Sequence, residues 1–324
     1  MGLNPDEFFQ INNDVLDEFR SSYDYARQEV KAWKENLKQK CLNSDFLDKW
    51  TLSKELSIPK DVNWPVYESG SNIATRKVWG AVIEEMASKQ TLLVGGSADL
   101  SGSNNTKTKN SKVINSTNFD GNYIHYGIRE HGMAAIMNGL ALHSGLIPFG
   151  GTFLIFSDYC KPSIRLSALM GLRVIYIFSH DSIGLGEDGP THQPIEQLTG
   201  LRAIPNLNVF RPADINETLE CWEIALKSKN NPSAITLSRQ KLPYISDGFS
   251  EKNKCSFGAY ELNITSHDYK LILIASGSEV EIALEAQKKL KEEQIDTKVV
   301  SMPCQEIFDK QDKDYNCLLY TSPS

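Results

Sequence analysis

The sequence lacks several features that would place the protein outside the cytosol or at a membrane. Its six cysteines are scattered, with no CxxC pair and no nearby histidine at metal-ligand spacing, which argues against a zinc site or a disulfide framework. The N-terminus, MGLNPDEFF, has neither the basic nor the apolar stretch of a signal peptide, and Asp6 stands where a myristoylation signal needs Ser or Thr. No apolar run approaches the roughly 20 residues that span a bilayer. The sequence therefore predicts a soluble, cytoplasmic protein without a membrane partner.

The chain also lacks an excess of basic residues. Lys and Arg number 34 against 41 Asp and Glu, so the formal net charge is -7. No long basic stripe or arm is present, and we therefore expect no binding to nucleic acid. A negatively charged substrate would have to meet a few local Arg and His side chains against this background.

Length and composition fall in the ordinary globular range. The 324 residues are 40% hydrophobic and 23% charged, which is enough apolar material for about two domains. Residues 1–68 are polar and charged, and from Asp14 to Lys40 apolar side chains recur at the three- and four-residue spacing of a helix. We interpret this part as packing helices and a linker that carry no chemistry.

From about residue 70 the pattern alternates between helix and strand. Expected helices span residues 72–88, 129–143, 163–170 and 214–227, and expected strands span residues 91–94, 173–178, 208–210 and 234–237. The strand from Val174 to Phe178 is apolar on both faces, which is typical of a parallel sheet covered by helices on both sides. Asp214 and Glu217 have the spacing of a capping box. Residues 69–246 are therefore predicted to form an α/β domain with a mainly parallel sheet, with ligand sites beyond the carboxyl ends of its strands.

A second α/β unit follows a polar stretch. The sequence predicts a strand over residues 271–275, a helix over 279–293 and a strand over 297–302. We assign residues 255–316 to the start of a second α/β domain, because the chain stops before that sheet could be complete. Residues 317–324 carry no pattern that predicts a structure.

Two polar segments lie next to the predicted elements where ligand sites are expected. Residues 95–104, GGSADLSGSN, are small enough to let the backbone approach a ligand, although an ordinary turn explains them equally well. Residues 122–133, NYIHYGIREHGM, place Glu130 at the start of an otherwise apolar helix, where a carboxylate is often only a partner of the helix dipole. Neither segment alone identifies a function.

An aromatic run and a polar loop add two further candidates. In residues 150–159, GGTFLIFSDY, three aromatic side chains are three apart, a spacing that in an isolated helix indicates a core more often than a stacking site. Residues 180–194, HDSIGLGEDGPTHQP, follow the most apolar strand and hold histidines and acidic residues where no helix or strand pattern needs them. Arg239 follows the strand at 234–237, and its guanidinium suits a phosphate, although an exposed arginine there is usually a solvated charge.

Taken together, the segments GSADL, HYGIREHGM, GGTFLIF, HDSIGLGEDGPTHQP and LSRQ resemble the transketolase family in order and spacing, from about residue 70 to residue 310. The resemblance implies a thiamine-diphosphate-binding fold. It also implies a transferase of the pentose phosphate pathway that moves a two-carbon ketol group reversibly from a ketose phosphate to an aldose phosphate, with thiamine diphosphate and Mg²⁺ as cofactors.

The resemblance assigns cofactor roles to matching residues. Glu130 corresponds to the catalytic glutamate that shares a proton with a ring nitrogen of the cofactor's pyrimidine. This role requires a buried carboxyl, because a carboxyl in water is ionised at pH 7. Phe156 corresponds to the residue that stacks on the pyrimidine ring. The other residues implied to line the same site are Asp99, Leu100, Phe153 and Tyr159.

The resemblance also assigns the sugar site. The residues implied to hold the sugar phosphate are Arg76, Ser103 and Arg239. The residues implied to contact the sugar hydroxyls are His180, Asp188 and His192. His192 is further implied to help move protons, as a second catalytic residue.

The family's motif for the metal and diphosphate, GDG with a following Asn, does not occur in this sequence. Residues 1–68 resemble the tail of the domain that carries that motif, so a partner is expected, either a second copy in a homodimer or a complementary N-terminal half. Two alternatives remain: a related thiamine-diphosphate enzyme, such as deoxyxylulose-phosphate synthase or the beta subunit of a keto-acid dehydrogenase, and a non-catalytic module that keeps the fold for binding.

Overall fold

The computed structural model describes residue 6 and residues 8–55, 63–89, 92–245, 252–266 and 268–320, which belong to two compact units, Met1–Glu55 and Leu56–Ser324. The first unit holds the helices α1 (Asn13–Lys40) and α2 (Ser44–Glu55). They contact each other through the rings of Trp33 and Trp50, whose centroids are 6.2 Å apart. Neither helix holds a buried residue among those described. The helix predicted from Asp14 to Lys40 is thus present, with its apolar side chains exposed.

The second unit is built on a six-stranded sheet. In chain order its strands are β2 (Leu93–Ser97), β3 (Tyr123–His125), β4 (Ile147–Phe153), β5 (Ile175–Ser179), β6 (Asn208–Phe210) and β7 (Ser233–Leu237). They are arranged as β3-β2-β4-β5-β7-β6, and every pair is parallel. Strands β5 and β7 are buried along their whole length, as expected where helices cover both faces. The predicted α/β fold with a mainly parallel sheet is therefore confirmed.

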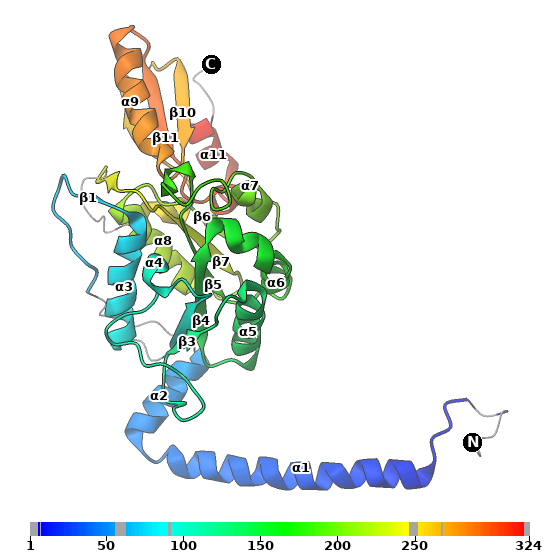
Figure 1. The fold of residues 1–324 in the computed structure, drawn as a ribbon. Coiled ribbons are helices and arrows are strands. Elements are labelled where there is room, and N and C mark those ends of the chain that lie inside the picture. Colours follow the sequence, from blue (N-terminus) through cyan, green and yellow to red (C-terminus); the bar gives the residue numbers. More distant parts are fainter. Residues whose placement is uncertain are drawn as a thin grey trace. The chain divides into compact units, whose positions relative to one another are not determined.

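Helices cover both faces of this sheet (Figure 1). On one face lie α3 (Thr75–Lys89) and α8 (Ile215–Lys227), and on the other lie α5 (Glu130–His143) and α6 (Ser157–Leu169). Trp79 of α3 and Trp222 of α8 meet edge to face, with ring centroids 4.5 Å apart. The opposite core joins the methionines of α5 to the aromatic side chains of β5. Two short helices, α4 (Ser101–Asn104) and α7 (Gln197–Arg202), lie in the connections.

Strands β3 and β4 and the start of helix α6 differ from the sequence prediction. Strands β3 and β4 were not predicted, because β3 is very short and β4 contains Pro148, Gly150 and Gly151, which disfavour strands. Gly150 is needed there, since an added Cβ would lie 2.4 Å from the sulfur of Met137. Helix α6 starts at Ser157, six residues before the expected start at 163. The aromatic run 150–159 is therefore not one helix but the end of β4, the 3-10 turn η1 (Leu154–Phe156) and the start of α6.

A three-stranded sheet forms the later part of the second unit. Its strands β9 (Tyr260–Ile264), β10 (Leu271–Ala275) and β11 (Thr297–Ser301) are arranged as β10-β11-β9, and α9 (Glu279–Glu292) packs on β10 and β11. Strands β10 and β11 are parallel, while β9 is antiparallel and was not predicted. Remaining elements are β1 (Asn72–Ile73), β8 (Leu242–Pro243), η2 (Ile183–Leu185), η3 (Lys254–Phe257), α10 (Gln305–Phe308) and α11 (Lys313–Tyr320).

The domain boundaries proposed from the sequence stay a prediction. Parts of the proposed domains, including residues 56–62, 246 and 321–324, lie outside the described residues, as does residue 91 of an expected strand. The helix start predicted at Asp214 is confirmed, since Asp214 is the N-cap of α8 and its Oδ1 accepts from the Glu217 N–H at 3.0 Å. The Glu217 carboxylate in turn accepts from the Ala213 N–H at 2.7 Å and from the Tyr260 hydroxyl at 2.9 Å, and it also bonds the Ser301 hydroxyl. This buried carboxylate therefore links α8 to β9 and β11. Within the described part of the chain, no helix is long and apolar enough to cross a membrane.

Candidate active site

The candidate residues follow the carboxyl ends of neighbouring parallel strands. Asp99 comes shortly after β2, Phe153 ends β4, His180 follows β5 and Arg239 follows β7. Because these four strands are adjacent and parallel, their carboxyl ends meet at one edge of the sheet. Glu130, at the first position of α5, is the fifth member of this edge. The sequence pattern thus correctly predicted which edge gathers the polar side chains.

A cavity of about 550 Å³ opens at this edge. It is lined by Ala98, Asp99, Leu100, Ile128, Glu130, Phe156, Tyr159 and His192. Five of the six residues predicted to contact the cofactor line it, and the sixth, Phe153, lies behind Phe156 with the two rings stacked at 5.8 Å between centroids and 7° between planes. Ala98 and Ile128 complete the lining and were missed, because an alanine and an exposed isoleucine give no sequence signal.

Glu130 lies in the wall of this cavity with 9% of its surface exposed. Its position at the start of α5 places the carboxyl near the positive end of the helix dipole. A neighbouring group is the Cys160 thiol, whose pKa is raised to about 12 by burial and, to a smaller extent, by the Glu130 charge. Glu130 is therefore a carboxyl held away from bulk water beside an uncharged thiol.

Aromatic rings form the opposite wall. The ring of Phe156 stacks on that of Tyr159 at 6.0 Å, and the imidazole of His192 meets Phe156 edge to face at 5.3 Å. The His192 Nδ1 lies 2.8 Å from the Thr191 hydroxyl. The cavity thus offers a flat apolar surface with a carboxyl and an imidazole at its margins, which suits a flat heteroaromatic ring.

His180 is buried beside this wall. Its ring stacks on Phe153 at 3.7 Å, and its Nδ1 lies 2.8 Å from the hydroxyl of Ser179. That hydroxyl donates to Asn104 Oδ1 at 2.5 Å, so a side chain from the small-residue segment 95–104 fixes the strand end that carries His180. The pKa of His180 is lowered to about 4, first by burial and then by the Arg76 charge. The imidazole is therefore neutral at pH 7.

Two guanidinium groups lie close to His180. Arg76 and Arg239 both lower the pKa of His180, and Arg239 also lowers that of Arg76, after burial as the main cause. Arg76 Nη1 donates to the main-chain oxygen of Ser103 at 2.6 Å, while its Nε is buried without a hydrogen-bond partner. Arg239 Nη2 contacts Glu187 at 3.4 Å in a pair that is largely exposed. Two guanidinium groups close to each other, one of them with a buried N–H that lacks a hydrogen-bond partner, indicate a site for an anion.

The structure therefore gathers all the sequence-predicted site residues in one region. Asp188 is exposed but raises the pKa of His180, and His192 lowers it, so both lie in the neighbourhood of that ring. Ser103 joins through its carbonyl group, not its hydroxyl, since the contact is to Arg76. Asn104 was missed as a supporting residue, although it belongs to a segment that the sequence singled out. In the described ranges, no group of three His, Cys, Asp or Glu residues is arranged to hold a metal ion.

Comparisons with known proteins agree with this geometry. Residues 71–244, more than half of the chain, match the family model for the transketolase pyrimidine binding domain, and residues 258–321 match that for the transketolase-like C-terminal domain. The transketolase of Sinorhizobium medicae is 57% identical over 246 residues, which cover 76% of this chain and 35% of the relative.

Two solved structures are also similar. The transketolase from Leishmania mexicana superposes with a TM-score of 0.90 at 40% identity, covering 98% of this chain and 47% of that one. A protein described as a split gene transketolase, inactive beta4 tetramer, superposes with a TM-score of 0.58 at 29% identity, covering 72% of both chains. This chain thus spans between about a third and half of the length of the full relatives that it matches. It belongs to the transketolase family.

Proposed function

We propose that this chain supplies the pyrimidine-binding half of a transketolase active site. In this role it holds the pyrimidine ring of thiamine diphosphate and a sugar phosphate while a two-carbon ketol group passes reversibly from a ketose phosphate to an aldose phosphate. The observation that carries the proposal is the meeting of a buried carboxyl, an aromatic wall and two guanidinium groups at one sheet edge.

The lining of the cavity fits the pyrimidine ring of the cofactor. The Phe156 ring offers a flat surface for stacking, and Glu130 offers a carboxyl at the margin where a basic ring nitrogen can meet it. When bound, the cofactor supplies the nucleophilic carbon and the electron sink that cleavage of the ketose carbon–carbon bond requires. The protein orients the cofactor and the sugar, and it supplies and accepts protons.

Glu130 has the role of holding a proton at its carboxyl and sharing it with the ring nitrogen. Its burial supports this role, because a carboxyl with 9% of its surface exposed meets a bound ring with little competition from water. His192, at the same margin, is placed to pass a proton to or from the sugar, and the neutral His180 accepts or donates hydrogen bonds to sugar hydroxyls.

Arg76 and Arg239 are proposed to hold the sugar phosphate. Bringing a phosphate between the two guanidinium groups relieves their mutual repulsion, and it gives the buried Arg76 Nε a partner. Arg239 forms an ion pair with the exposed Glu187, and a phosphate that binds Arg239 has to displace this contact. The cost is small, because exposed ion pairs contribute little stability.

The Mg²⁺ and the diphosphate are proposed to be held by another segment or subunit. Two apolar side chains that line the cavity are exposed, Ile128 to 79% and Tyr159 to 66%. Apolar surface of this kind usually marks a protein interface. We propose that a second copy, in a homodimer, or a complementary N-terminal half covers it, in the cytoplasm.

The test is a reconstitution. The chain is mixed with Mg²⁺, thiamine diphosphate, a ketose phosphate donor and an aldose phosphate acceptor, with and without the diphosphate-binding domain of a transketolase. We expect turnover only when that domain is present. Product formed by the chain alone, or no product in any mixture with a well-folded added domain, would contradict the proposal.

A further inference from the structure

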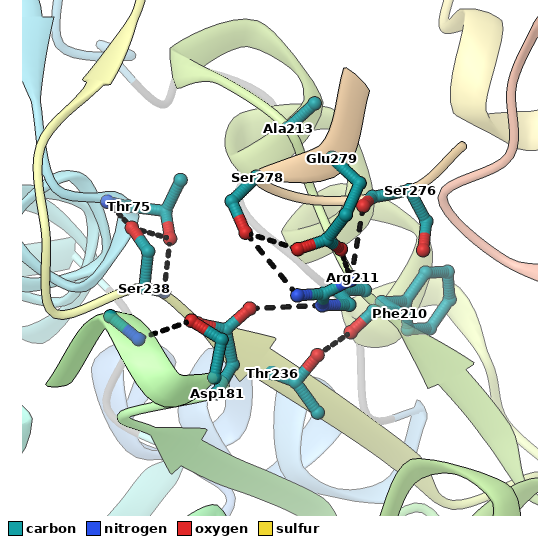
Figure 2. Close-up of polar contacts among 12 residues, drawn as sticks. Thr75, Asp181, Phe210, Arg211, Ala213, Thr236, Ser238, Ser276, Ser278 and Glu279 are labelled. Carbon is teal, nitrogen blue, oxygen red and sulfur yellow. Dashed lines mark hydrogen bonds and ion pairs between the residues drawn. The ribbon is translucent and has the colours of Figure 1, made fainter. Parts of the chain in front are cut away.

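A buried arginine joins the six-stranded sheet to the three-stranded sheet β10-β11-β9, called the second sheet below. Arg211 follows β6, and its guanidinium contacts Asp181, which follows β5, and Glu279, in the first turn of α9 (Figure 2). The distance from Arg211 Nε to Asp181 Oδ2 is 2.9 Å, and Nη1 also donates to the Ser276 carbonyl group at 3.1 Å. The side chains of Arg211 and Asp181 are only 8% and 1% exposed, whereas that of Glu279 is 48% exposed. Each buried charge therefore depends on its partners.

Main-chain bonds hold Arg211 to the same second sheet. Its N–H donates to the Pro303 carbonyl group at 2.8 Å, and its own carbonyl group accepts from the Gly277 N–H at 3.0 Å. Gly277 has a φ of +59°, and a Cβ at this position would lie 2.8 Å from Arg211 Cγ. The turn before α9 thus needs glycine in order to wrap around the arginine. Arg211 is fixed to the second sheet through both its main chain and its side chain.

Asp181 transfers this restraint to its neighbour in sequence, His180. His180 has a φ of +60°, in the left-handed region that residues other than glycine rarely adopt. Such a backbone persists only where the surrounding structure holds it. On one side, Ser179 is paired within the sheet to β4 and β7, and on the other side Asp181 is held by Arg211. The strained residue between them is the one whose ring lies against the aromatic wall.

We propose that Asp181, Arg211 and Glu279 are positioning residues that hold His180 in the orientation in which it meets the sugar, and that the second sheet thereby takes part in substrate recognition. None of the three is among the residues that line the 550 Å³ cavity, and all three line a separate cavity of about 220 Å³. Their proposed effect on the sugar is therefore indirect, through the backbone of His180, which is joined to Asp181. The role of His180 toward the sugar rests on the proposed function, whereas the hold of the cluster on His180 does not.

The first test follows the protonation of the His180 ring in the full chain by NMR. The signal is assigned with His180→Gln, and Asp181→Asn is the test variant, because the amide keeps the shape while Arg211 keeps Glu279. In the unaltered chain the pKa of His180 is about 4, because the ring is buried and because Arg76, Arg239 and His192 nearby also lower it, while Asp188 acts in the opposite direction. Release of the ring in Asp181→Asn should raise the pKa toward the ordinary value of 6.5.

Glu279→Gln is the second variant, since its partly exposed side chain can change without threatening the fold. It should shift the His180 titration in the same direction by a smaller amount. Glu281→Gln is the matched control, because Glu281 carries the same charge in the same helical turn and is not a partner of Arg211. Circular dichroism confirms that each variant is folded, and if Asp181→Asn does not fold, Glu279→Gln carries the test.

A kinetic readout in the reconstituted enzyme separates the two proposals. Asp181→Asn should raise KM for the ketose phosphate on the order of 10-fold, as expected for a lost hydrogen bond, with a smaller change in kcat. Arg211→Met should also raise KM for the ketose phosphate, and Arg211→Lys, which keeps the charge, should raise it less. An unchanged His180 titration in the folded variants would overturn the positioning role. Absence of turnover in the unaltered reconstituted enzyme, with the titration still shifting in the variants, would instead overturn the proposed function.

Discussion

Glu217 allows a quantitative test of how the two sheets are joined. Burial, followed by the charge of Asp214, raises its pKa from 4.5 to about 7, although hydrogen bonds from Ser301, Ala213 and Tyr260 oppose the rise. The folded protein therefore prefers the protonated carboxyl more than the unfolded chain does. The stability that this preference contributes is complete below about pH 4.5 and is lost as the pH rises through about 7.

The magnitude follows from the same two values. The difference between 4.5 and about 7, at about 1.4 kcal/mol for each unit of pKa, corresponds to about 3.5 kcal/mol of unfolding free energy, most of which is lost between pH 4.5 and pH 8. Glu217→Gln cannot ionise and keeps the side-chain shape. As the pH rises from 4.5 to 8, the unaltered chain loses this contribution and the variant does not. We therefore expect the unfolding free energy of the variant minus that of the unaltered chain to increase by about 3 kcal/mol over this range.

Urea unfolding followed by tryptophan fluorescence is the assay, because the buried Trp222 lies on the same helix as Glu217. Glu285→Gln, on the exposed surface of α9, is the control and should show no such trend. A stability difference between Glu217→Gln and the unaltered chain that does not change with pH would refute the reasoning.

Three further predictions concern the sheet and the anion site. Gly150→Ala should lower the unfolding free energy by about 1–3 kcal/mol, because the new Cβ would lie 2.4 Å from the Met137 sulfur. Its control is Gly139→Ala, in an open part of α5, which should raise the unfolding free energy by about 0.5–1 kcal/mol; in the same urea titration, the opposite sign for either variant would contradict the reasoning. Trp79→Ala should cost about 3–5 kcal/mol because Trp79 is fully buried, and a loss below 1 kcal/mol in that titration would count against the described core. Arg76→Met should raise KM for the phosphorylated donor at least about 10-fold in the reconstituted enzyme and weaken competition by inorganic phosphate, whereas an unchanged KM would remove Arg76 from the phosphate site.

The sequence predicted the parts of the fold that local chemistry determines. The strand at Val174–Phe178 was recognisable because it is apolar on both faces, and the start of α8 was recognisable because Asp214 and Glu217 have the spacing of a capping box. Strand β4 was missed because Pro148, Gly150 and Gly151 have low strand propensity; Gly150 packs closely against α5, and Gly151 packs against Thr106 and Asn104. Its pairing partners, not its own sequence, make it a strand.

For the site, too, some residues could be predicted from the sequence and others could not. Glu130 and His180 were identified because their segments are polar where the fold needs no polarity and because those segments match a known family. Asn104 and Arg211 could not be assigned, since their roles depend on contacts with residues 75 and 30 positions away in the sequence. The wall formed by Ile128 is likewise a product of tertiary structure.

The most direct test of the central proposal is Glu130→Gln in the reconstituted enzyme. Two quantities are measured: the rate of ketol transfer, and the rate at which the proton on the reactive thiazolium carbon of thiamine diphosphate exchanges for deuterium. The control is Glu292→Gln, which changes an exposed residue at the end of α9. We predict that Glu130→Gln slows the exchange and abolishes transfer while binding of the sugar phosphate persists, and that the control changes neither. Near-normal exchange and turnover in Glu130→Gln would contradict the assignment of this carboxyl as the proton-sharing group.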